Sequence, residues 1–171
     1  MAKQGIHFVM MGGTIDSHYE GTKDTIEPNM TSAIPKYVNG LKLYHEIEFT
    51  EVCMKDSREV NEADLHKLLE TIENSKHKKI IITHGTYTID STARYLKANL
   101  KRKDLAIIFT GAMVPLEFPY NDAGFNFGYT IAKIESLNDG IFVCMNGKLF
   151  LPEEVAKLIS EGRFMSIFGE K

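Results

Sequence analysis

The stretch that decides the fold is residues 79–86, Lys79-Ile80-Ile81-Ile82-Thr83-His84-Gly85-Thr86. Its first five residues form a nearly continuous β-branched run, which is typical of a strand covered on both faces. The glycine and threonine that follow predict a tight turn. Before the run, a cap at Asn61 and leucines at helical spacing predict a helix, and after it a second helix is predicted from about Asp90 to Leu100.

The alternation of strands and helices continues along the whole chain. Further strands are predicted at Ile6–Met11, Val52–Met54, Leu105–Phe109 and Gly140–Met145, and further helices at Thr31–Val38, Ala123–Ser136 and from about Pro152 onward. Residues 16–29, polar and without hydrophobic periodicity, are expected to be a long loop. Alternating elements imply right-handed βαβ units. We therefore predict one doubly wound, mostly parallel α/β domain over residues 1–171, flavodoxin-like or Rossmann-like.

Composition excludes several functional classes. Hydrophobic residues make up 43% and charged residues 25%, with a formal net charge of −3, which is ordinary globular usage and excludes a disordered chain. A slightly acidic chain without a basic block argues against nucleic acid or membrane as a partner. No apolar run is long enough for a signal peptide or a membrane span, so a cytoplasmic protein is expected.

The cysteines and histidines suggest no metal site. Cys53 and Cys144 are too few for a disulfide framework or a four-thiolate zinc site, and both are expected to be buried free thiols. The six histidines show no ligand spacing, and His84 is expected to shape its turn. We predict that the protein needs no cofactor.

Three predicted strands end in small, hydroxyl-bearing turns: Gly12-Gly13-Thr14, Gly85-Thr86 and Thr110-Gly111. In this fold ligands bind at the carboxyl ends of the strands, beside the point where strand order reverses. Thr14 is a candidate nucleophile, but a hydroxyl needs a base, and Thr86 backed by an amine could relay its proton. Lys157, on the last predicted helix, is the candidate amine; the alternative is a solvated lysine on a helix face.

Several of these segments resemble the bacterial-type L-asparaginases. Met11-Gly12-Gly13-Thr14-Ile15 and Ile82-Thr83-His84-Gly85-Thr86-Tyr87-Thr88 are similar to the two signatures of that family. Further similar segments follow the family's order: Asp56-Ser57, Thr110 to Pro115, Asn121 to Asn126, and Met145-Asn146 with Val155-Ala156-Lys157. The resemblance runs from Ile6 to about Phe168.

The resemblance implies a role for each matching residue. Thr14 would attack a side-chain amide, with Thr86 and Lys157 as the second threonine and its activating amine, and with Tyr19 polarising Thr14. Ser57 would hold the carboxylate end of the substrate, and backbone N–H groups near Gly13 and Thr86 would stabilise the oxyanion. The remaining substrate-binding positions implied are Gly13, Gly85, Tyr87 and Ala112. The family also forms dimers and tetramers, so a homodimer or homotetramer is expected.

Two departures from the family concern recognition of the substrate's α-ammonium group. The family has an aspartate where this chain has Tyr87, and a phenol with a pKa near 10 cannot act as a counter-ion at pH 7. Family members are about twice as long, and their second domain contributes a further acid near the α-ammonium. We therefore expect attack on an amide to survive while specificity for asparagine does not.

Three functional classes stay open. The first is an amidohydrolase that uses Thr14 on asparagine or a related small amide and releases ammonia. The second is a non-catalytic or altered-specificity module that binds a small carboxylate or nucleotide-like ligand. The third is an acyl or glycosyl transferase on the same scaffold, whose covalent intermediate is intercepted by something other than water.

Overall fold

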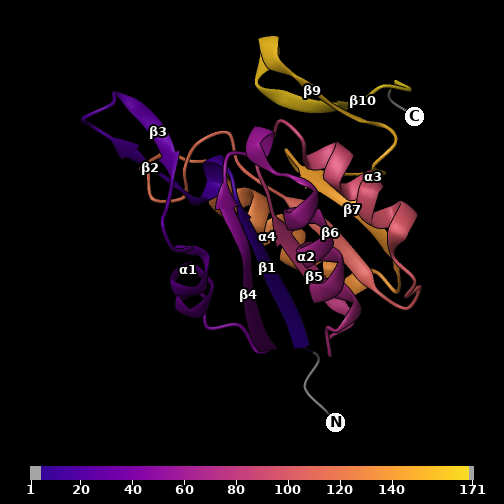
Figure 1. The fold of residues 1–171 in the computed structure, drawn as a ribbon. Helices are drawn as coiled ribbons and strands as arrows, with labels where there is room; N and C mark the ends of the chain where they lie inside the picture. Colours follow the sequence, from indigo (N-terminus) through magenta and orange to yellow (C-terminus); the bar gives the residue numbers. More distant parts are fainter. Residues whose placement is uncertain (1–4, 170–171) are drawn as a thin grey trace.

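The computed structural model describes residues 5–169 of the protein (Figure 1). Its centre is a six-stranded sheet in the order β4-β1-β5-β6-β7-β8. The strands are β1 (Gly5–Gly12), β4 (Glu46–Lys55), β5 (Lys79–Thr83), β6 (Ala106–Thr110), β7 (Gly140–Met145) and β8 (Lys148–Phe150). All neighbours pair in parallel except β7 and β8, which form an antiparallel hairpin. The predicted α/β fold is confirmed, and its parallel part has the flavodoxin-like strand order.

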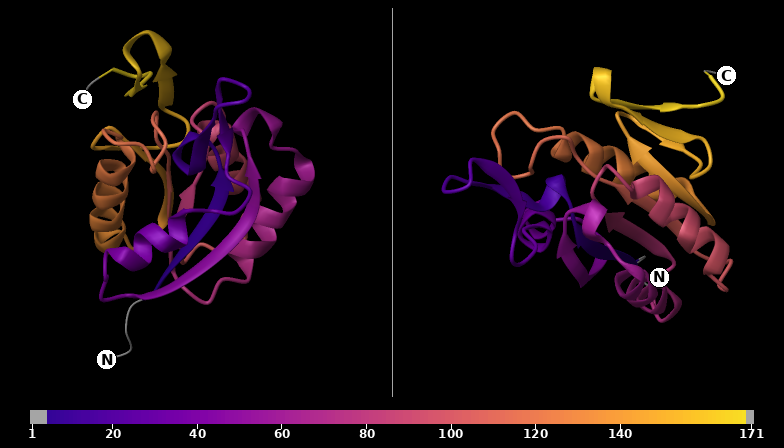
Figure 2. Two further views of the ribbon diagram at one scale, coloured as in Figure 1. Left: turned by 90° about the vertical axis from the view of Figure 1, so that its left-hand side faces the viewer. Right: turned by 45° about the horizontal axis from the view of Figure 1, so that its top comes forward.

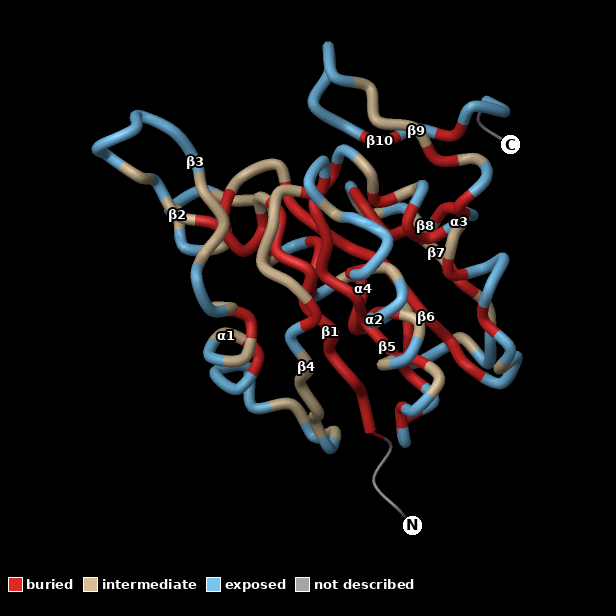
Figure 3. The backbone as a smooth tube through the Cα atoms, viewed as in Figure 1, coloured by how far each residue is buried: buried red, intermediate tan, exposed pale blue. Residues whose placement is uncertain are grey.

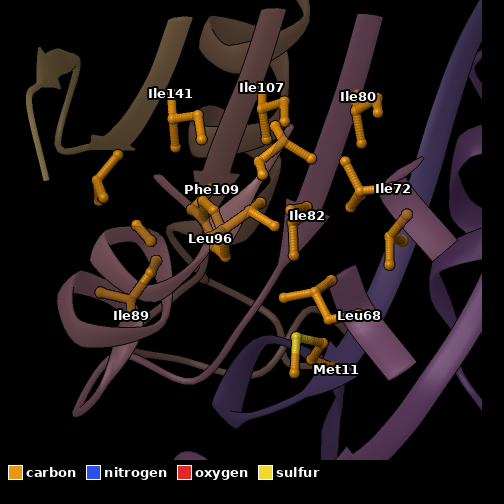
Figure 4. Packing of buried hydrophobic residues seen from close by; sticks show 14 of the residues in the cluster. Met11, Leu68, Ile72, Ile80, Ile82, Ile89, Leu96, Ile107, Phe109 and Ile141 are labelled. Atoms are coloured by element: carbon orange, nitrogen blue, oxygen red, sulfur yellow. The ribbon is translucent and has the colours of Figure 1, made fainter. Parts of the chain in front are cut away.

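Two layers of helices cover the sheet. The helices are α1 (Ile34–Gly40), α2 (Glu62–Glu73), α3 (Ile89–Asn99) and α4 (Ala123–Ser136). Leu68 and Ile72 of α2 and Leu96 of α3 pack with Ile80 and Ile82 of β5 on one face (Figure 4). The other face is covered by α1 and α4, which belong to the core cluster that contains Ile81. Two-sided burial of β5 explains its β-branched run, in which successive side chains point to opposite faces.

The helix starts follow local rules that the sequence already showed. The side chain of Asn61 accepts a hydrogen bond from the backbone N–H of Asp64, and Asp64 accepts one from the backbone N–H of Asn61. This capping box satisfies two otherwise unpaired donors at the start of α2. Pro35 lies in the first turn of α1, where its missing N–H costs nothing.

The predicted loop over residues 16–29 is wrong, because most of it forms a hairpin. Strands β2 (Ser17–Glu20) and β3 (Thr25–Pro28) pair with each other and belong to no larger sheet. With little core to cover, the hairpin needs no alternation of apolar residues. At its base the buried carboxylate of Asp16 accepts hydrogen bonds from Asn29, Ser32 and the N–H of Ala33, which ties the hairpin to the start of α1.

The helix predicted from Pro152 is also wrong. Its residues form β9 (Val155–Leu158), which pairs antiparallel with β10 (Arg163–Ser166). The apolar run is short and ends before Gly162, whose φ of 62° makes the turn. Asn146 accepts a hydrogen bond from the backbone N–H of Phe164 and so ties this hairpin to the end of β7. Lys157 therefore stands on a strand and not on a helix.

Two smaller differences concern edge positions. The predicted strand Val52–Met54 is the end of the ten-residue β4, an edge strand whose partly solvated residues hide its pattern. Cys144 is buried as predicted, but Cys53 on β4 is only half-buried.

The carboxyl ends of the parallel strands lie at one edge of the molecule (top in Figure 1). Beyond this edge the β2–β3 hairpin projects on one side and the β9–β10 hairpin on the other, as two further views also show (Figure 2). The central strands β1, β5 and β6 are buried along their whole length, whereas most of both hairpins is exposed or half-buried (Figure 3). Within residues 5–169, no helix combines the length and apolar character that crossing a membrane requires.

Candidate active site

The candidate site lies where β1 and β5 end side by side. From β1 the chain crosses to β4 on one side of it, whereas β5 and the later strands follow on the other side. The turns after β1 and β5 therefore leave the sheet at its topological switch point, where folds of this type bind ligands. The first turn carries Gly13 and Thr14, and the second carries Gly85 and Thr86.

The backbones of these turns touch. A Cβ atom on Gly13 would lie 2.3 Å from the Cα and N atoms of Gly85, and Gly13 has a φ of 78°. A Cβ atom on Gly85 would lie 2.6 Å from the Cβ and 2.7 Å from the Oγ of Ser57. Only glycine permits this approach, because a side chain would occupy the space of the Gly85 main chain at Gly13 and of the Ser57 side chain at Gly85. The loops after β1, β4 and β5 are thus stacked, which brings Gly13, Gly85 and Ser57 together.

Thr86 and Lys157 meet although 71 residues separate them. Thr86 is buried, and its Oγ1 lies 2.7 Å from the Nζ of Lys157, which reaches in from β9. Burial lowers the pKa of Lys157 from that of a free lysine, and the nearby Arg58 guanidinium lowers it further, while Asp56 acts in the opposite direction. A larger share of neutral amine results, and a neutral amine can accept a proton from a threonine hydroxyl.

Ser57 offers a hydroxyl with no partner. It opens a short 3-10 turn after β4, and its backbone carbonyl accepts a hydrogen bond of 2.8 Å from the hydroxyl of Thr88. Its own Oγ is buried, and among the described residues it has no hydrogen-bond partner. Buried hydroxyls are normally paired, so this one is available to a ligand.

Tyr87 stands at the opening of the site. It is half exposed, and the Nζ of Lys157 lies 3.9 Å from its ring centroid. The Cζ of Arg58 also lies over the ring, at 4.7 Å. Arg58 in turn donates two side-chain hydrogen bonds to Asp56, of 2.9 and 2.8 Å. Sequence reasoning missed Arg58; its place beside Ser57, directly after a strand, was the available signal.

His84 is a structural residue beneath the site. It is fully buried, and burial lowers its pKa to about 4, so the ring is neutral at pH 7. Its Nδ1–H donates to the carbonyl of Gly85 over 2.8 Å, which fixes the turn that carries Thr86. This agrees with the expectation that His84 shapes its turn.

One of the two expected backbone donors, the one at Gly13, is already engaged. The N–H of Gly13 already donates to the carbonyl of Lys55 over 2.9 Å, so it cannot serve an oxyanion in this conformation. Among the hydrogen bonds of residues 5–169, none uses the N–H of Gly85 or Thr86. These two donors lie in the turn that carries the Thr86–Lys157 pair.

Three predicted residues take less direct positions. Thr14 is part exposed at the start of a 3-10 turn, next to the Gly13–Gly85 contact. Tyr19 lies on β2, and its hydroxyl donates to the carboxylate of Asp24 over 2.5 Å, so it is engaged within its own hairpin. Ala112 is completely buried in the core cluster that contains α4, so its side chain presents no surface to a ligand.

A flavodoxin-like sheet whose small, hydroxyl-bearing turns meet at its switch point is typical of α/β proteins that bind ligands there. Residues 5–166 match the family model described as asparaginase, N-terminal. The chain therefore belongs to the asparaginase family, and it matches the N-terminal domain of that family.

Curated relatives agree with this assignment. L-asparaginase 2 of Escherichia coli is 29% identical over 170 residues, which cover 92% of this chain and 47% of that protein. A glutaminase-asparaginase of Acinetobacter glutaminasificans is 26% identical over 174 residues, covering 92% and 51%. The chain spans about half the length of the curated relatives it matches.

Solved structures share the fold. The thermostable L-asparaginase from Thermococcus kodakarensis superposes with a TM-score of 0.84 at 24% identity, over 98% of this chain and 52% of that one. A probable cytoplasmic L-asparaginase from Campylobacter jejuni gives a TM-score of 0.79 at 24% identity, over 96% and 52%.

The contact between the turns can be tested with Gly13→Ala. The added Cβ meets the main chain of Gly85 at a positive φ, so the free energy of unfolding should fall by roughly 2–4 kcal/mol in urea titrations. The control is Gly128→Ala, where a Cβ on α4 meets nothing within 4 Å. That change should be neutral or stabilise by up to about 1 kcal/mol. Similar effects of the two changes would contradict the close approach.

The buried His84 predicts a pH dependence of stability. Its pKa is lowered in the folded protein to about 4, against about 6.5 when unfolded, so the unfolded chain binds the extra proton. Stability contributed by the neutral ring is present above pH 6.5 and is lost as the pH falls toward 4, by about 2 kcal/mol between pH 7 and 5. Urea unfolding at both pH values should show a smaller decrease for His84→Gln than for the parent, and an unchanged decrease for the exposed control His66→Gln.

Proposed function

We propose that the chain is the nucleophile-bearing domain of an amidohydrolase that hydrolyses the side-chain amide of asparagine or a small relative to acid and ammonia. The observation that carries this proposal is the 2.7 Å contact between the Lys157 Nζ and the Thr86 Oγ1 at the switch point of the sheet. The amine of lowered pKa beside the buried Thr86 hydroxyl can accept a proton through it, at the edge of the sheet where folds of this type bind ligands. Membership of the asparaginase family supports the same reaction class.

The reaction assigns the nucleophile to Thr14. Its Oγ1 attacks the amide carbon, its proton passes through Thr86 to neutral Lys157, and the carbonyl oxygen becomes an oxyanion. The intermediate collapses, the C–N bond breaks, and the nitrogen takes the proton back and leaves as ammonia. Water then adds to the Thr14 ester, and its breakdown releases the acid and restores the hydroxyl. The touching backbones of Gly13 and Gly85 support this assignment, since each precedes one of the two threonines.

The oxyanion and the substrate's carboxylate need separate donors. The unused N–H groups of Gly85 and Thr86 are the candidates for the oxyanion, and each such donor is worth a few kcal/mol of barrier. The unpartnered Oγ of Ser57 is the candidate for the carboxylate. With Gly13 and Ala112 engaged elsewhere, the substrate-binding set reduces to Ser57, Gly85, Thr86 and Tyr87.

A non-catalytic binding module is the second candidate, and the position of Tyr19 favours it. The hydroxyl of Tyr19 is held by Asp24 within the β2–β3 hairpin, and the nucleophile is left without that tyrosine. Such a module would be stabilised by a small carboxylate in thermal unfolding without releasing ammonia. For the chain itself we also propose one α/β domain and assembly as a homo-oligomer.

Activity separates the two candidates. Purified protein should release ammonia from asparagine, glutamine or another small amide, measured by a coupled assay. Thr14→Ala should lower kcat/KM by roughly 10³-fold or more. Lys157→Met should lower it by about 10²- to 10⁴-fold, because the proton acceptor is lost. Lys36→Met, an exposed lysine on α1, is the matched control and should change little. Ammonia release that survives in Thr14→Ala would refute the proposal.

The pH profile tests the role of Lys157 by a different route. The amine acts when neutral, so kcat should rise with pH through the pKa of Lys157, which burial and Arg58 lower. Removing the guanidinium in Arg58→Gln should raise that pKa and move the rising limb to higher pH. In Lys157→Met the residual rate no longer depends on the amine, so the rising limb should be absent. A pH profile whose rising limb stays in place in Arg58→Gln would contradict the assignment of Lys157 as the proton acceptor.

A further inference from the structure

The opening of the site is lined by cations, and this bears on the class of substrate if the proposed function holds. The phenol of Tyr87 is half exposed there, and both the Lys157 ammonium and the Arg58 guanidinium lie over its ring, at 3.9 and 4.7 Å from the centroid. The face of an aromatic ring attracts cations within about 6 Å. In Tyr87 that attraction is already used by two side chains of the protein itself.

Two neighbouring carboxylates, Asp56 and Asp90, are paired with arginines. Asp56 accepts three hydrogen bonds from Arg58, two from the guanidinium and one from the backbone N–H. Asp90, three residues after Tyr87, pairs with Arg94 over 2.8 Å on α3. The charged groups that act on the Lys157 amine are Arg58 and Asp56, which are of opposite sign and paired with each other. Among the described residues near Tyr87, Asp56 and Asp90 are therefore both engaged by arginines, whereas Glu59, a further carboxylate near Arg58, is exposed to solvent.

A substrate ammonium would meet unfavourable charge at this opening. It would approach the Arg58 guanidinium and the share of Lys157 that is protonated, and like charges placed side by side cost free energy without screening or a counter-ion. Tyr87 carries a phenol where a carboxylate would be needed, so it supplies no counter-ion. A substrate without an ammonium at this position meets no such penalty.

A carboxylate meets the opposite situation. The Oγ of Ser57 is buried without a partner and lies on the loop that packs against Gly85. Arg58, the next residue, adds positive charge on the same side. A hydroxyl donor beside a guanidinium suits the acid end of a small amide acid.

From this geometry we infer that Tyr87 sets the specificity of the proposed hydrolase for ω-monoamides of dicarboxylic acids that carry no α-ammonium group. Such substrates keep the amide for Thr14 and the carboxylate for Ser57, and their carbon next to the carboxylate bears hydrogen, hydroxyl or oxo in place of ammonium. Among these compounds, succinamate corresponds directly to asparagine and differs from it only by the missing ammonium group. Comparing the hydrolysis of succinamate with that of L-asparagine therefore probes the charge at Tyr87 directly.

The first measurement is the ratio of kcat/KM for succinamate to that for L-asparagine in the parent protein. The ratio should exceed about tenfold, as a modest charge penalty implies. Hydrolysis of asparagine at least as efficient as that of succinamate would overturn the inference and leave the proposed function standing.

Two variants assign the preference to Tyr87. Tyr87→Asp adds a carboxylate at the opening and should move the ratio toward asparagine by roughly tenfold or more. Tyr87→Phe keeps the ring and its cations, removes only the hydroxyl, and should leave the ratio within about twofold. An unchanged ratio in Tyr87→Asp, or an equal shift in Tyr87→Phe, would overturn the role of Tyr87. Thermal unfolding of both variants verifies that they are folded.

A binding measurement keeps this inference separable from failure of the chemistry. Thermal unfolding of Thr14→Ala protein is followed with succinate and with L-aspartate at equal concentrations. Succinate should raise the Tm more than L-aspartate does. Equal or greater stabilisation by L-aspartate, or none by either, would overturn the inference whether or not the parent protein hydrolyses an amide. Succinate binding with no turnover of either amide would instead refute the proposed function alone.

Discussion

The close approach of three main-chain turns is the constraint on which the site depends. Gly13, Gly85 and Ser57 come from the ends of β1, β5 and β4, which are adjacent in the sheet, and no side chain larger than hydrogen fits at the two glycines. Because these turns touch, Thr14 and Thr86, which are 72 positions apart in the chain, both lie directly after turns at the same edge of the sheet. The cores on both faces of β5 hold the strands in register and so hold the turns in contact.

The electrostatics of the site follow from its position at this edge. Lys157 is brought in from a separate hairpin, and burial together with Arg58 lowers its pKa, which suits a proton acceptor. The guanidinium that promotes this effect is itself paired with Asp56, so the opening holds a lysine, an Arg58–Asp56 ion pair whose guanidinium acts more strongly on that lysine, and a phenol. One arrangement of charge thus bears both on the reactivity of Thr86 and on the ligands that the opening admits.

The prediction from sequence was most accurate where burial in the core or a local helix cap determines the sequence pattern of a segment. Lys79–Thr83, Ala123–Ser136 and Gly140–Met145 were found with correct bounds, since burial imposes a clear apolar pattern on them. It failed at residues 16–29 and after Pro152, where short strands pair only with each other and hydrogen bonds replace apolar periodicity. The site residues came mainly from motifs resembling a family; the motifs did not reveal that Tyr19 bonds Asp24 or that Ala112 is buried.

The sequence by itself determined the α/β alternation, the hydroxyl-bearing turns and the family, because these depend on residue type and on spacing within short segments. Only the tertiary structure decided that Lys157 lies on a strand and reaches Thr86, that Ser57 keeps a buried free hydroxyl, and that Arg58 and Lys157 share the ring of Tyr87. The contacts of Lys157 with Thr86 and of Arg58 and Lys157 with Tyr87 join segments distant in the chain. Their geometry depends on the order of the strands in the sheet.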